Sequence, residues 1–129
     1  MNEALLKQRT KNFAENIIVL CRKLPNSREG FLIGNQIFRS ATSVAANYRA
    51  ACRARSTSEF ISKLSIVEEE ADETLFWLEI IDEMQILEHP LLKTLLQEDN
   101  KIIAIIVASI KTAKTNRKPG ATKNPKFAI

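Results

Sequence analysis

The chain has 129 residues, of which 45% are apolar and 26% are charged, and its formal net charge is +4 at pH 7. This length fits one domain, and three glycines and four prolines supply few of the turns that a sheet needs. Frequent Ala, Leu, Ile, Glu and Lys instead predict an all-α protein. The longest apolar run, residues 102–108, is shorter than the about 20 residues of a membrane span. We therefore expect a cytoplasmic protein without a membrane segment.

The first predicted helix covers about residues 2–24. Phe13, Ile17 and Leu20 recur at spacings of three and four residues, which places them on one face. The segment 25–27 ends this helix, and Ser27 is predicted as the N-cap of the next one.

The second predicted helix covers about residues 28–55 and is basic on its outer side. Its predicted inward stripe consists mostly of small residues, namely Phe31, Gly34, Phe38, Ala41, Ala45, Tyr48 and Cys52. Cys52 and Cys21 stand singly in helical patterns and are expected to be reduced, buried thiols. Small side chains let a neighbouring helix approach closely.

A capping box, Ser56-Thr57-Ser58-Glu59, follows directly and starts a third helix over about residues 57–87. So short a connection predicts that the second and third helices are antiparallel neighbours. The third helix has one apolar line through Leu64 and Ala71 and a second, wider face after Leu75, made of Phe76, Trp77, Ile80, Ile81, Met84 and Leu87. One bundle core can hardly cover both faces. We therefore predict a homo-oligomer with Phe76, Trp77, Ile80 and Met84 at the subunit interface.

The fourth helix is expected to begin after His89-Pro90 and to end at about Thr115. Residues 116–129 contain two prolines, a glycine and several basic residues, and are predicted to be a flexible basic tail. The expected architecture is therefore an antiparallel up-down-up-down four-helix bundle over residues 1–115, without a second domain.

Charge is distributed unevenly along the chain. Residues 28–56 carry +4, residues 57–90 carry −9 and residues 111–129 carry +6. The acidic stretch contains E-x-x-E and E-x-x-D spacings at Glu70-Glu73 and Glu79-Asp82, which a metal-dependent hydrolase would use on two facing helices. Here one helix carries them all, so a solvated or ion-paired face is the preferred interpretation. We expect no catalytic residue, no metal and no cofactor, and hence not an enzyme.

The basic residues are the remaining candidates for function. Those predicted to contact nucleic acid are Arg39, Arg49, Arg53, Arg55, Lys111, Lys114, Arg117 and Lys118. Such clusters neutralise phosphates with little discrimination between bases. The leading hypothesis is an oligomeric bundle that binds RNA or an RNA-associated protein. The alternative is a scaffold that recruits a protein partner, with its charges serving solubility and pairing between helices.

Residues 24–83 also resemble a known family. The features are the Leu24-Pro25 entry, Gln36, Arg39-Ser40, Ser43, Asn47, the Ser58-Glu59-Phe60 start, Leu64, and the run E-T-L-F-W-L-E from Glu73 to Glu79. This segment is similar to the bacterial four-helix-bundle proteins first noticed in intervening sequences of 23S rRNA genes. The resemblance implies a ring-like homopentamer, similar also to the accessory protein of diversity-generating retroelements, a basic barrel that binds a reverse transcriptase and nucleic acid. It implies no enzymatic activity.

Overall fold

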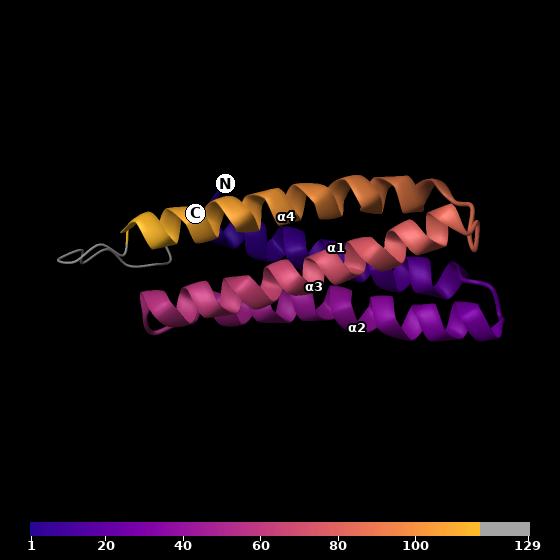
Figure 1. The fold of residues 1–129 in the computed structure, drawn as a ribbon, viewed down its shortest axis with the longest axis horizontal. Coiled ribbons are helices and arrows are strands. Elements are labelled where there is room, and N and C mark those ends of the chain that lie inside the picture. The colour runs from indigo at the N-terminus through magenta and orange to yellow at the C-terminus, as the bar shows by residue number, and fades with distance from the viewer. Residues whose placement is uncertain (117–129) are drawn as a thin grey trace.

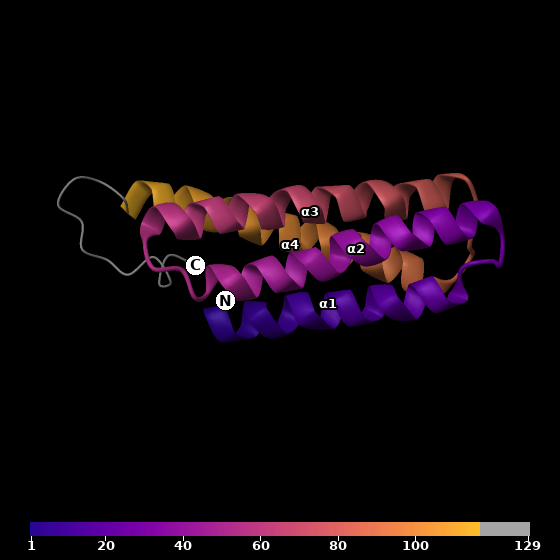
Figure 2. The same cartoon turned by 90° about the horizontal axis from the view of Figure 1, so that it is seen from below.

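The computed structural model describes residues 1–116, which form four helices and no strand. Helix α1 spans Glu3–Lys23, α2 spans Arg28–Ala51, α3 spans Thr57–Glu83 and α4 spans Pro90–Asn116. The helices lie side by side in one elongated bundle (Figures 1 and 2). The α1–α2 and α3–α4 turns lie at one end, and the α2–α3 turn lies at the other, together with the start of α1 and the end of α4. The predicted all-α class and four-helix bundle are confirmed.

The starts of the first three helices are fixed by local side-chain caps. In each case the side-chain oxygen of the N-cap residue accepts a hydrogen bond from the backbone N–H three positions later: Asn2 from Leu5 at 2.8 Å, Ser27 from Gly30 at 3.1 Å and Ser56 from Glu59 at 3.1 Å. These bonds satisfy backbone donors that the first helical turn leaves free. The two serine caps are those predicted from the sequence.

The end of α3 differs from the prediction by about one turn, because the helix stops at Glu83 and does not reach Leu87. Gln85 adopts a positive φ of 53°, and the Ile86 N–H donates to the Ile81 carbonyl at 3.0 Å. This is the hydrogen-bond pattern of a Schellman ending, which usually carries glycine at the left-handed position. Because glutamine stands there, the apolar period continues past the turn and the sequence gives no stop signal.

The core runs along the whole bundle and is mostly aliphatic. Fully buried side chains come from all four helices and include Leu6, Phe13, Ile17, Leu20, Ile37, Val44, Tyr48, Phe60, Leu64, Leu78, Ile81, Leu95, Ile102 and Ile106. One buried polar contact joins α2 to α3, where the hydroxyl oxygens of Thr74 and Ser40 lie 2.8 Å apart. Burial of these apolar surfaces is the main stabilising contribution to the fold.

The inward face of α2 is rotated from the predicted stripe. Ala41, Tyr48 and Cys52 are buried as expected, but Phe31 and Phe38 are 69% and 46% exposed. The positions that are buried in addition are Gly30, Ile37, Ser40, Val44 and Ala51. The two stripes share residues and lie less than a third of a turn apart. The Phe31–Phe38 line therefore faces the groove between α1 and α2, where Leu24 and Gly34 also lie, instead of the bundle axis.

Candidate nucleic-acid interface

Basic residues from all four helices gather at one end of the bundle, because the chain passes that end at the start of α1, the α2–α3 turn and the end of α4 (Figures 1 and 2). Apart from Arg9, which pairs with Glu98, the lysines and arginines of these segments are Lys7, Lys11, Arg49, Arg53, Arg55, Lys63, Lys111 and Lys114. All except the partly buried Lys63 are exposed. The same segments carry only two carboxylates, Glu3 and Glu59. We call this group of residues the basic end.

Arg49 and Arg53 form the centre of the predicted group: Arg49 lies in the last turn of α2, and Arg53 lies in the turn that follows the helix. Both are exposed, and no ion pair joins either of them to another described residue. Arg55 lies in the α2–α3 turn, where its backbone N–H donates to the Glu59 carboxylate at 3.1 Å. This bond comes from the residue before the N-cap Ser56; it fixes the corner of the chain, and the Arg55 side chain is exposed. Three exposed guanidinium groups therefore lie close together in sequence at this corner.

On α4, Lys111 and Lys114 lie one turn apart and are both exposed. They belong to the end of α4 that reaches the basic end (Figure 1). Arg117, Lys118 and the predicted tail lie outside the described residues, apart from Asn116, which ends α4.

Arg39 is separated from this group by the structure. It lies in the middle of α2 and pairs with two carboxylates of α3: its guanidinium is 3.0 Å from Glu70, and it also donates to Glu73. The hydrogen bond from Arg39 holds the pKa of Glu73 below its ordinary value, and the same bond raises the pKa of Arg39. The two carboxylates beside this half-exposed guanidinium oppose the approach of a phosphate. Arg39 instead connects α2 to α3, as one of the alternatives considered from the sequence suggested.

The four residues predicted at a subunit interface lie along the outer side of α3. Phe76 and Met84 are 51% and 68% exposed, whereas Trp77 and Ile80 are half-buried. The Phe76 and Trp77 rings meet edge to face, with centroids 5.0 Å apart. The Trp77 indole N–H also donates to Glu73 at 3.3 Å. We call these four residues the apolar face.

Two other members of the wide apolar pattern on α3 do not belong to this face. Ile81 is fully buried in the core of its own chain, and Leu87 is half-buried against that core beyond the end of α3. The apolar face is therefore narrower than the complete pattern of large apolar residues.

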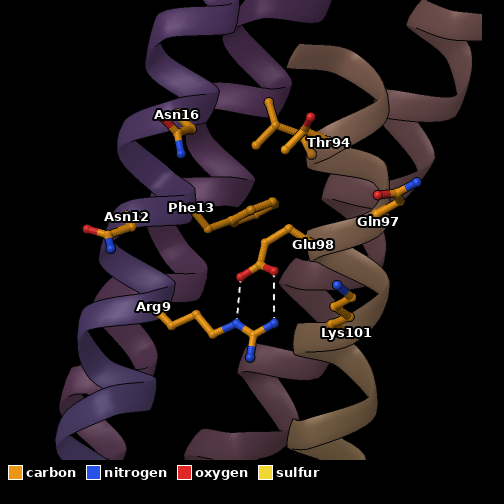
Figure 3. A pocket seen from close by; sticks show the side chains of 9 residues that line it. Arg9, Asn12, Phe13, Asn16, Thr94, Gln97, Glu98 and Lys101 are labelled. Carbon is orange, nitrogen blue, oxygen red and sulfur yellow. Dashed lines mark hydrogen bonds and ion pairs between the residues drawn. The ribbon is translucent and has the colours of Figure 1, made fainter. Parts of the chain in front are cut away.

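A polar hollow of about 250 Å³ separates α1 from α4 (Figure 3). Its lining includes the amides of Asn12, Asn16 and Gln97, and the Arg9–Glu98 ion pair crosses from one helix to the other. Arg9 donates two hydrogen bonds to the Glu98 carboxylate, at 2.6 and 2.9 Å. The hydrogen bond from Arg9 to Glu98 raises the pKa of Arg9. The pair thus bridges two helices across a hollow that side chains do not fill.

Residues 1–116 contain no group of three or more His, Cys, Asp or Glu side chains arranged to hold a metal ion. Two of the carboxylates considered for a metal site, Glu70 and Glu73, are bound to Arg39. In the same part of the chain, no helix combines the length and the apolar character required to cross a bilayer.

The fold and these surfaces define a class of protein: an elongated four-helix bundle with a basic end and an apolar face on one side. A family model described as "23S rRNA-intervening sequence protein" matches residues 2–108, and the chain belongs to this family. A crystal structure of a protein of unknown function from the S23 ribosomal protein family of Bacteroides thetaiotaomicron is similar, with a TM-score of 0.79 and 33% identity. The match covers 87% of this chain and 100% of that one. Comparison with curated proteins gives no match. The family resemblance noted in the sequence is confirmed.

Sequence reasoning missed Lys7, Lys11 and Lys63 as members of the basic end. Lys63 stands alone among the acidic residues of its helix, whereas Lys7 and Lys11 flank Arg9 in a short basic stretch that lies far from Arg49 and Arg53 in the sequence. The signal becomes visible only when the helices are aligned as a bundle, because residues near the start of α1 and the end of α2 then lie at the same end.

Proposed function

We propose that this chain is a non-enzymatic, up-down-up-down helical bundle that assembles with copies of itself and binds RNA through its basic end. The subunit number that we propose, five, and a location in the cytoplasm follow from the family resemblance and the sequence. The observation that carries the RNA-binding proposal is the collection of mostly exposed lysines and arginines from four helices at one end of the bundle, which form no ion pair with another residue in positions 1–116.

The electrostatics of this end support a phosphate-binding role. A protein that neutralises several phosphates releases condensed counterions, so its affinity depends on the number of cations and on the salt concentration. Contacts of this kind position the nucleic acid but carry little sequence information. The described residues of the basic end contribute eight side-chain cations. In an assembled particle this number is repeated in every subunit, which strengthens binding further.

The opposite end of the bundle has a different charge balance. Its basic residues, Arg22, Lys23, Arg28 and Lys93, alternate with the acidic residues Glu29, Glu79, Asp82, Glu83 and Glu88. Like charges placed near an incoming phosphate oppose binding. RNA is therefore expected to approach the end that carries Arg49 and Arg53.

Replacing Arg49 and Arg53 together with glutamine is expected to weaken the binding of a structured rRNA fragment by about tenfold or more at low salt, because two phosphate contacts per subunit are lost. A matched control replaces Arg22 and Lys23 with glutamine. These two exposed residues lie in the last turn of α1, and their replacement removes the same charge from the opposite end of the bundle. The control is expected to change the affinity much less. Fluorescence anisotropy with labelled RNA measures both variants.

Two results of this experiment would contradict the proposal or favour the alternative. Equal losses in the two variants would contradict binding at the basic end. Loss of assembly in the Arg49/Arg53 variant, seen by sedimentation, would favour the alternative in which these charges organise a scaffold. The apolar face is the observation that supports that alternative, because an exposed patch of large apolar residues commonly marks a protein interface.

A further inference from the structure

Asp99 lies in the middle of α4 on the side that packs into the bundle. Its side chain is fully buried, and neither carboxyl oxygen has a hydrogen-bond partner among the described residues. The neighbours on the same helical face, Leu92, Leu95, Ile102 and Ile106, are buried apolar residues. A buried polar group without a partner costs free energy, and a buried charge without a counterion costs far more. Asp99 is therefore tolerated in this position mainly in its neutral, protonated form.

The charged groups around Asp99 make its ionisation still less favourable. α4 packs closely against α3 and less closely against α1. From α3 the charged neighbour is Asp72, and on α4 itself it is Glu98. From α1, the cation that pairs across to α4 is Arg9, and it already directs two donors at Glu98 (Figure 3). Burial, with a further contribution from Asp72 and Glu98, raises the pKa of Asp99 from 3.8 to about 8.

We propose that the proton on the Asp99 carboxyl holds α4 in the bundle, so that loss of this proton releases α4 from α3 and α1. Release gives the carboxylate access to water and increases its distance from Asp72. α4 is held less closely by α1 than by α3, and its α1 side includes a hollow of about 250 Å³ that one ion pair crosses, so α4 is expected to separate first along α1. This device does not depend on RNA binding.

The pH dependence follows from the difference in proton binding. In the closed bundle Asp99 keeps its proton up to about pH 8, whereas in the open form the exposed carboxyl loses it near its ordinary pKa of 3.8. The closed form therefore binds more protons between these values, so its stability relative to the open form falls as the pH rises. The ratio of open to closed molecules should rise by about tenfold per pH unit from about pH 4 to about pH 8, and should level off above that.

Native-state hydrogen exchange of the whole chain, measured by mass spectrometry and corrected for the intrinsic pH dependence of exchange, tests the proposal. In the wild type, protection of α4 amides is expected to fall by about tenfold per unit between about pH 5 and pH 8, while α2 amides change much less. In the Asp99→Asn variant, which has nearly the same shape but cannot ionise, the slope for α4 should disappear. The matched Asp72→Asn variant should keep the slope and level off at lower pH, because one repelling charge is gone.

Wild-type protection in α4 that does not change with pH would overturn the proposal even if the Asp99→Asn variant failed to fold. Parallel loss of protection in α2 and α4 would also overturn it, because the whole bundle would then open together. An unchanged slope in Asp99→Asn would assign the pH dependence to another group and would equally refute the role of Asp99.

Discussion

Replacing Phe76 and Met84 together with aspartate is expected to leave a folded chain that is monomeric at micromolar concentration. The two side chains are 51% and 68% exposed in the single chain, so charge is tolerated there while the subunit is alone. If another copy covers them, the aspartates must lose water next to apolar surface, and an unpaired buried charge is strongly unfavourable. We expect the dissociation constant of the assembly to increase by about two orders of magnitude or more, which corresponds to about 3 kcal/mol.

Sedimentation velocity measures this change, and circular dichroism verifies that the helices remain. The control replaces Leu5 and Val107 with aspartate, since these residues of α1 and α4 are 57% and 44% exposed and lie outside the apolar face. The control is expected to sediment as the wild type does. A Phe76/Met84 variant that sediments like the wild type would show that the apolar face does not join subunits.

The second large effect is expected at the entry of α2, where replacing Gly30 with alanine should lower the free energy of unfolding by about 2–3 kcal/mol. A Cβ atom on Gly30 would lie 2.3 Å from the Pro25 carbonyl oxygen and 3.2 Å from the Ser27 hydroxyl oxygen. Backbone cannot move aside as a flexible side chain can, so the α1–α2 turn must shift. That shift also disturbs the cap in which Ser27 accepts from the Gly30 N–H.

Gly34 provides a matched control one helical turn further along α2. A Cβ atom there would meet only the Leu24 side chain, at 3.4 Å, which is ordinary van der Waals contact. Alanine is a better helix former than glycine by about 1 kcal/mol, so Gly34→Ala is expected to be neutral or stabilising. Urea denaturation of both variants compares the two sites. Equal destabilisation of the two would contradict the close approach described at Pro25.

Local signals in the sequence predicted most of the fold. The serine caps, the short turns and the helical periods give four helices whose starts lie close to those observed. The predictions of the inward face of α2 and of the end of α3 were wrong, because both features depend on the rest of the molecule. The inward face of α2 is determined by its packing against both α1 and α3. The sequence of α2 contains two overlapping apolar stripes, the predicted one with Phe31 and Phe38 and the observed one with Ile37 and Val44. The left-handed turn at Gln85 is stabilised by hydrogen bonds of the α3 end, and the usual glycine is missing.

The candidate site could be predicted only in part. The exposed arginine pair Arg49 and Arg53 was visible as a basic stretch with helical spacing. The ion pairs of Arg39 could not be predicted in this way, because its partners Glu70 and Glu73 lie about thirty residues away on another helix. The burial of Asp99 was also not predicted, since two adjacent polar residues, Asp99 and Asn100, within an apolar pattern indicate exposed positions. Charge pairing and burial across helices depend on rotation about the helix axis, which the period alone fixes only roughly.

The most direct test of the proposed function is the salt dependence of the affinity between the assembled wild-type protein and a structured rRNA fragment. If the basic end neutralises phosphates, the logarithm of the affinity should fall linearly with the logarithm of the salt concentration, by about three orders of magnitude between about 50 and 200 mM. The slope should become shallower when Arg49 and Arg53 are glutamine. Absence of binding at the lowest salt concentration, or an affinity that salt does not change, would contradict the account.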